Sequence, residues 1–269
     1  MRGAIVSELK RLLHSRAIAL ALIVSCALLA LSVKGISGTF MYAPAPDGSV
    51  FGFISGNFAA DNPALSAMRT ALFPTFIWAT CQIAVIAMSF SEDERTPARS
   101  LSIARGVRAI SSSVSYLVAH AGAVVVLYCM VTTISFAISF GRFGGVLDSR
   151  ALVEFVPFLL MNTGLLVSVG AETLLVSAVS RRPLLSVGVM VVSLYVGMFL
   201  YMQGVIQGQV NPLCYVLSPA PYLMRISALD IAAIPVVFVL VYVLVTTFIS
   251  VLGASVPMGK GAVRHGGDS

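Results

Sequence analysis

The chain has 269 residues, of which 58% are hydrophobic and only 10% are charged. Soluble domains carry roughly 25% charged residues, so these few charges could not cover the surface of a water-soluble fold of this length. The formal net charge of +6 does not indicate a nucleic-acid-binding protein, because the basic residues lie in short segments beside apolar stretches, as in membrane proteins.

The N-terminal segment predicts a short helix that lies in the membrane interface, over residues 1–16. Its apolar residues follow helical spacing, with charged residues among them, as in an amphipathic interfacial helix. A plain cytoplasmic extension of the first span is the alternative.

Six apolar stretches follow, each near or above the length of about 20 residues that crosses a bilayer. They cover residues 17–33, 71–90, 114–140, 152–179, 184–206 and 232–254. A polar stretch rich in Gly, Pro, Asn and Asp separates the first two, and we expect an ordered loop there with one or two short helices.

The predicted fold class is therefore an all-α integral membrane protein with six transmembrane helices. A single transmembrane domain covers residues 1–269, and residues 255–269 form a cytoplasmic tail. Twelve of the 17 Lys and Arg residues fall on the inner side if the N-terminus is cytoplasmic. This bias predicts a multi-pass protein of the inner (cytoplasmic) membrane, with both termini in the cytoplasm.

The inner loop between the second and third spans contains the most informative sequence. The acidic cluster Glu92, Asp93 and Glu94 opens the loop, and four arginines follow. Pro97 suits the first turn of a short helix and Gly106 suits its end. Composition alone favours a solvated loop, whereas a short charged helix at this place could dock a soluble partner.

A series of residues in this loop resembles a known pattern. An acidic residue leaves the second span, then come a Thr, a basic residue, an apolar run and Arg-Gly with another Arg: Glu92, Thr96, Arg99, Leu101, Arg105, Gly106 and Arg108. The loop resembles that of the permeases of type-2 ATP-binding-cassette exporters, in which it forms a coupling helix seated in a cleft of the ATPase subunit. Arg95 stands before Thr96, where family members often have Gly, and this departure leaves the substrate open.

The general layout is also similar to that family. It shares the interfacial N-terminal helix, the six spans, the large outer loop, the tiny inner loop at Ser180–Pro183 and a Pro-containing connection before the last span. The resemblance implies short re-entrant helices in that connection.

The function that the resemblance implies is that of a permease subunit in an ATP-driven exporter. Its cargo would be amphipathic, lipid-like, peptide or drug-like, and it would move by alternating access. The partners would be an ATP-binding-cassette ATPase, a second permease copy or a related permease, and membrane lipid. ATP and Mg²⁺ would bind on the ATPase, since this chain has no GxxxxGK[ST] loop. We expect it to have no catalytic residues, to bind no metal or cofactor, and to have no enzymatic activity of its own.

One ionisable residue lies deep in a predicted span. Glu172 sits about two turns before the inner end of the fourth span, where a charge is costly unless it is paired or hydrated. It is a candidate pathway-lining or proton-linked carboxylate. The favoured alternative is a hydrogen bond across helices, or pairing with Arg181 or Arg182.

Two other function classes stay open. A secondary transporter or channel without an ATPase would need several deep ionisable groups or interrupted helices in two related halves. A structural subunit of a larger membrane complex would need neither.

Overall fold

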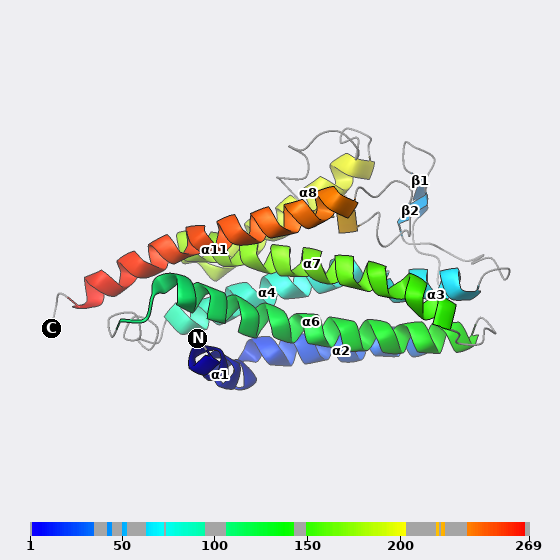
Figure 1. Ribbon diagram of the computed structural model, residues 1–269, viewed down its shortest axis with the longest axis horizontal. Helices are drawn as coiled ribbons and strands as arrows, with labels where there is room; N and C mark the ends of the chain where they lie inside the picture. Colours follow the sequence, from blue (N-terminus) through cyan, green and yellow to red (C-terminus); the bar gives the residue numbers. More distant parts are fainter. Residues whose placement is uncertain are drawn as a thin grey trace.

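The computed structural model describes residues 2–34, 42–44, 50–52, 63–72, 74–94, 106–142, 149–202, 219–220, 222–223 and 236–266. Long helices dominate this part of the chain (Figure 1). They are α1 (Arg2–Leu13), α2 (Arg16–Lys34), α3 (Pro63–Leu72), α4 (Thr75–Glu94), α6 (Ala109–Arg142), α7 (Ser149–Ser180), α8 (Pro183–Met202) and α11 (Val236–Gly266).

Five stretches of the described chain are long and apolar enough to cross a membrane. These are Thr70–Asp93, Ala109–Arg142, Leu152–Ser180, Pro183–Leu200 and Val236–Met258. Helices α1 and α2 add a sixth if they are counted together as one span, although they meet at an angle of 69°. The molecule is thus a helical, multi-pass membrane protein, as the composition predicts, and the layout of six crossings stays a prediction.

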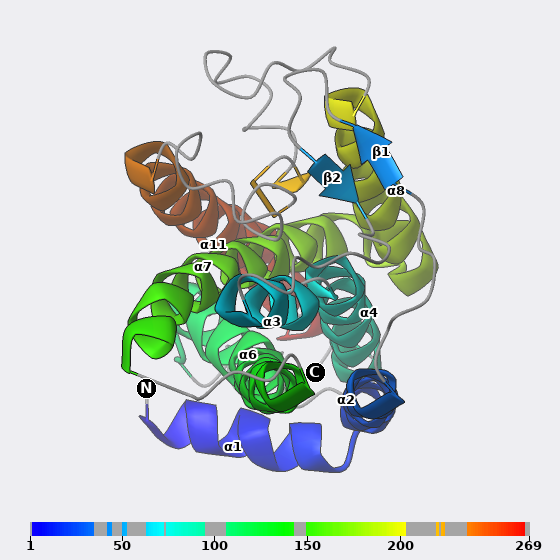
Figure 2. The same cartoon turned by 90° about the vertical axis from the view of Figure 1, so that its right-hand side faces the viewer.

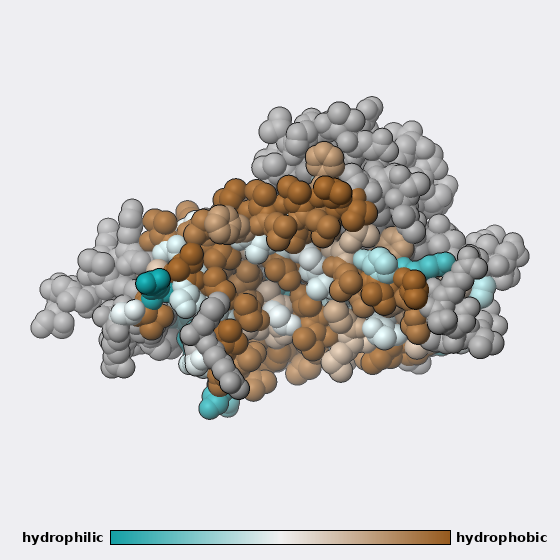
Figure 3. Space-filling view, in the orientation of Figure 1, coloured by the Kyte–Doolittle hydropathy of each residue, from teal (hydrophilic) through white to brown (hydrophobic). Residues whose placement is uncertain are grey.

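The surface has the apolar character that a lipid environment requires. Apolar side chains on α7, α8 and α11 point outward, with Val153 at 70%, Leu184 at 87% and Val237 at 72% exposure. In Figure 3 they form a broad hydrophobic belt over the middle of the molecule. Helix α4 lies inside the bundle, where Trp78 and Ile83 are fully buried.

The two ends of the bundle carry different segments. Helix α1, the start of α6 and the C-terminal end of α11 lie at one end, and α3 with the short strands lies at the other (Figure 1). Figure 2 shows α1 crossing the bundle at a steep angle to the long helices, in keeping with its bend from α2. This is the arrangement expected of a helix that lies along a membrane surface.

The outer loop differs from the sequence prediction. Helix α3 is one of the expected short helices, but strands β1 (Tyr42–Pro44) and β2 (Val50–Gly52) also form a two-stranded antiparallel sheet, with Tyr42 opposite Gly52. This sheet is the exception to the all-α prediction in the described residues.

A break at Pro74 separates α3 from α4, and it lies within the apolar stretch Thr70–Asp93 that covers the second predicted span at 71–90. Proline has no N–H to donate and disfavours helix in the residue before it. The Pro74 carbonyl accepts from the Trp78 N–H at 3.0 Å, and the Thr75 hydroxyl donates to the Leu72 carbonyl. Together these bonds end one helix and begin the next.

Helix α11 continues through Gly266, beyond the predicted end of the last span at residue 254. Ala254, at the predicted end, and Met258, one turn beyond it, are buried against residues of α4, α6 and α7. The Ser113 hydroxyl also contacts the Met258 sulfur at 3.1 Å. The predicted tail at 255–269 is therefore helical through Gly266, and its first turn packs against the bundle through Met258.

Candidate functional site

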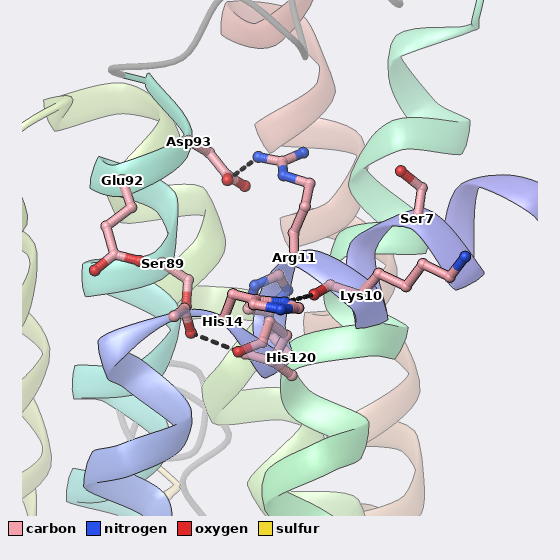
Figure 4. Close-up of a pocket in the computed structure, with 10 residues that line it drawn as sticks. Ser7, Lys10, Arg11, His14, Ser89, Glu92, Asp93 and His120 are labelled. Atoms are coloured by element: carbon pink, nitrogen blue, oxygen red, sulfur yellow. Dashed lines mark hydrogen bonds and ion pairs between the residues drawn. The ribbon is translucent and has the colours of Figure 1, made fainter.

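A cleft opens where α1 crosses the ends of α4 and α6, and we call it the α1 cleft (Figure 4). Its volume is about 460 Å³. It is lined by polar and charged side chains from the three helices, with one leucine: Ser7, Lys10, Arg11, Leu12, His14, Ser15, Ser89, Glu92, Asp93 and His120.

An ion pair ties α1 to the end of α4 across this cleft. The Arg11 guanidinium donates to the Asp93 carboxylate and, at 3.1 Å, to the Glu8 carboxylate on its own helix. The Arg11 side chain is 31% exposed and both carboxylates are 11% exposed. At this partial burial an ion pair stabilises the contact by on the order of 1 kcal/mol. The pair can therefore hold α1 against α4 and still allow α1 to move away.

The turn that follows α1 is closed by hydrogen bonds to carbonyl groups in the last turn of the helix. The N–H groups of His14 and Ser15 donate back to the carbonyls of Arg11 and Leu12, at 3.1 and 2.9 Å. The Ser15 hydroxyl donates to the same Leu12 carbonyl, and His14 Nδ1 donates to the Lys10 carbonyl. These bonds close the last turn of α1 before the chain bends into α2.

Glu92 is the predicted docking residue that lines the α1 cleft. In Figure 4 its side chain points away from the Arg11–Asp93 pair. The two charged neighbours at the end of α4 therefore face different ways: Asp93 faces α1, and Glu92 lies at the side of the cleft.

Gly106 and Arg108 lie just before α6 and are exposed. Gly106 has φ of +97°, a conformation that favours glycine, and its predicted role in ending a short helix stays a prediction. The Arg108 carbonyl accepts from the Ser112 N–H at 3.1 Å and so opens α6. The other predicted docking residues, Thr96, Arg99, Leu101 and Arg105, lie outside the described residues.

Glu172 makes hydrogen bonds within and between helices. The Tyr242 hydroxyl of α11 donates to Glu172 Oε1 at 2.8 Å, and Ser168 of α7 donates to the same oxygen at 3.2 Å. Ser168 also bonds with Thr246 of α11 at 2.6 Å. The cross-helix hydrogen bond is therefore present, and the pathway role of Glu172 stays a prediction.

Arg181, the first residue after α7, contacts α11. Arg181 Nη2 donates to the Pro257 carbonyl of α11 at 3.4 Å. Arg181 has φ of +54°, which places a non-glycine residue in the left-handed region. The Ser180 and Ser186 hydroxyls bond at 2.7 Å across the turn, so this short connection is held from both sides.

The sequence did not reveal the Arg11–Asp93 pair. Both residues belong to charged segments that we singled out, but 82 positions separate them, and no spacing rule joins residues that far apart. The only signal was that both charges flank apolar spans on the same predicted side of the membrane.

In the described part of the chain, no three His, Cys, Asp or Glu residues gather where a metal ion could bind. A comparison of the sequence with known protein families and with characterised proteins gives no match.

Proposed function

We propose that this chain is the membrane-spanning permease subunit of an ATP-driven exporter. It resides in the cytoplasmic membrane with both termini inside, pairs with a second permease and moves an amphipathic cargo. A separate ATPase binds ATP and Mg²⁺ and docks on the segment between α4 and α6.

The observation that carries the proposal is the ion pair of Arg11 with Asp93 at the end of α4. Asp93 stands next to Glu92, at the point where the predicted docking segment leaves the bundle. A force on that segment would act directly on α4 and α6. Through Arg11 it would also act on α1, and from there on α2.

The packing of the bundle suits a rigid-body movement. Helices α4, α6 and α7 share buried side chains in both hydrophobic clusters, so a push at one end moves them together. Closure of the ATPases would then tilt the bundle between two arrangements, which is a form of alternating access.

The test is a purification of the tagged chain from its host in a mild detergent, followed by identification of the proteins that co-purify. We expect an ATPase in stoichiometric amount. Changing Glu92 and Arg105 together to Ala should remove that ATPase or uncouple its ATP hydrolysis from transport, because both lie in the docking segment.

The matched control changes a carboxylate and a guanidinium far from that segment, Glu154 and Arg142, to Ala. These residues lie near the first turn of α7 and at the last residue of α6, and the ATPase should stay bound. A wild-type preparation with an intact bundle and no ATPase would overturn the proposal. Altered assembly with unchanged transport in the E92A/R105A variant would indicate a structural subunit.

A further inference from the structure

Buried polar side chains without partners follow one face of α4. Trp78, Gln82 and Ser89 are spaced by four and seven residues, which places them on the same side of a helix. Their exposure is 0%, 0% and 2%. In the part of the chain that the structure describes, the Trp78 indole nitrogen, both Gln82 amide atoms and the Ser89 hydroxyl have no hydrogen-bond partner.

The neighbouring helices add polar groups of the same kind near Trp78. The Tyr128 hydroxyl and Thr132 Oγ1 of α6 and Asn162 Oδ1 of α7 are also buried and lack a partner among the described residues. Tyr128 meets the Trp78 ring edge-on, with 5.9 Å between ring centroids.

The side chains of Thr75, Thr132 and Asn162 are close enough to the Tyr128 hydroxyl to act on it as hydrogen-bonding neighbours, but none of the three meets it with the distance and angle of a direct hydrogen bond. The five residues Thr75, Trp78, Tyr128, Thr132 and Asn162 form what we call the polar junction. Within it, Asn162 Nδ2 donates to Thr75 Oγ1 at 3.4 Å and the Thr75 hydroxyl donates to the Leu72 carbonyl, whereas the other polar atoms of the junction have no partner among the described residues. Buried polar atoms that converge from three helices without a partner are the usual surroundings of a buried water molecule.

The hydrogen-bond donors and acceptors of these side chains fit water better than a cation. The indole N–H of Trp78 only donates, the Oδ1 atom of Asn162 only accepts, and hydroxyl groups do both. A cation would satisfy the oxygen atoms but would leave the N–H groups of Trp78 and Gln82 unpaired. Water both donates and accepts, so it satisfies every group of the set.

Gln82 and Ser89 connect the polar junction to the α1 cleft. Ser89 lines that cleft, and the eleven residues from Trp78 to Ser89 span about 17 Å of helix. Gln82 lies between them and faces Gly170 of α7, where a Cβ atom would lie only 2.5 Å from the Gln82 amide nitrogen. The missing side chain at Gly170 therefore leaves the space that the amide occupies.

We propose that α4 carries a line of internal water molecules that joins the α1 cleft to the polar junction through Gln82. This line would bring solvent from the end at which α1 crosses the bundle to the opposite end of α4, where Trp78 lies three residues after the start of the helix. The proposal does not depend on an ATPase partner.

The chain's single tryptophan, Trp78, gives a direct probe. The full-length protein would be labelled with ¹⁵N at the indole nitrogen and placed in lipid nanodiscs, where it gives one indole resonance. We expect a magnetisation-transfer signal between the indole proton and long-lived water. Gln82→Leu should slow exchange of that proton with solvent by about tenfold or more, because exchange must then await a wider opening of the bundle.

Thr80→Val is the matched control on the same helix. Thr80 Oγ1 donates to the Phe76 carbonyl and approaches Tyr195 Oη at 3.3 Å, away from the line of waters, so exchange should match the wild type. Tyr128→Phe is a second variant that keeps the ring packing, and it should weaken the water signal.

Absence of a water signal at the indole of the wild-type protein would overturn the proposal. A water signal together with unchanged exchange in the Gln82→Leu variant would also overturn it, since water would then reach the polar junction by another route.

Discussion

Among the glycines that the structure describes, Gly170 is the one with the least room for a side chain. An added Cβ would lie 2.5 Å from Gln82 Nε2 and 3.2 Å from the Ala121 Cβ. Gln82 can move at its tip but is fully buried, and Ala121 cannot move without its helix. The glycine is therefore required by the close approach of α4, α6 and α7.

We predict that Gly170→Ala lowers the free energy of unfolding by about 1–3 kcal/mol, as overpacking does in other cores. Unfolding in detergent, followed by circular dichroism, measures this change. The control is Gly122→Ala on α6, where an added Cβ has nothing within 4 Å. That variant should be as stable as the wild type or slightly more so, and equal losses in the two variants would argue against the tight contact.

Tyr242 contributes a hydroxyl whose removal can be tested by itself. Tyr242→Phe keeps the ring but deletes the donor at 2.8 Å from Glu172. We expect a loss of about 0.5–2 kcal/mol in the same unfolding assay, within the range for hydrogen bonds between membrane helices. Tyr195→Phe, at an exposed tyrosine with a 3.3 Å contact, should change stability less. An equal effect of both substitutions would contradict the role of the Glu172 bond.

The sequence predicted that Glu172 lies deep in the fourth span, but it did not identify the residue that donates a hydrogen bond to it. Tyr242 lies 70 positions away, on a helix whose rotation about its axis the sequence does not determine. Trp78 and Tyr128 show the same limit. Both are buried in the core, but their polar atoms converge with those of Asn162 only because α4, α6 and α7 come together.

At the scale of elements, the connection of α1 to α4 is the feature with the clearest consequence. Helix α1 is amphipathic and steeply bent from α2. The Arg11–Asp93 pair holds α1 against the end of α4. Leu12, the next residue of α1, is buried. The pair should therefore affect the opening of α1 more than the stability of the whole bundle.

We predict that Arg11→Ala lowers the protection of the α1 amide hydrogens by about 3–10-fold, which corresponds to one partly exposed ion pair. Hydrogen exchange in nanodiscs, followed by mass spectrometry, measures this. Lys10→Ala is the control, since Lys10 is exposed and forms no ion pair in the described part of the chain. Loss of protection in both variants, or in neither, would show that Arg11 does not hold α1.

The helices themselves could be predicted well because apolar runs of this length have few other uses. The predicted limits of the first span, 17–33, differ from α2 by one residue at each end. The errors have local causes. Pro74 breaks the helix near the start of the second span, and the packing of Met258 extends α11 beyond residue 254. The β1–β2 sheet escaped prediction because two strands of three residues leave no periodic signal.

At the scale of the whole molecule, the segments predicted to be inside gather at one end. Helix α1, the end of α4 and the end of α7 lie there, whereas α3 lies at the other end (Figure 1). Helix α6 has 34 residues and is about 51 Å long, which exceeds the hydrocarbon thickness of about 30 Å. At least one of its ends therefore extends beyond the hydrocarbon.

This arrangement gives a prediction of orientation. In a variant with every native cysteine replaced by Ala, a new cysteine at Gly3 or at Gly141 would be modified with a membrane-impermeant maleimide. Both glycines have space for a side chain. We expect labelling at Gly141→Cys in intact cells and at Gly3→Cys only after permeabilisation, because the positive charge bias places α1 inside. The reverse pattern would invert the topology.

The two-residue turn between α7 and α8 restricts how the molecule can deform. Arg181 and Arg182 alone connect the two helices, and the Ser180–Ser186 bond joins them across the turn. A slide of α8 past α7 by one helical turn would need about 5.4 Å of extra chain, which this connection does not contain. Helices α7 and α8 therefore behave as one mechanical unit, and any large change of shape must be absorbed at the connections on either side of it.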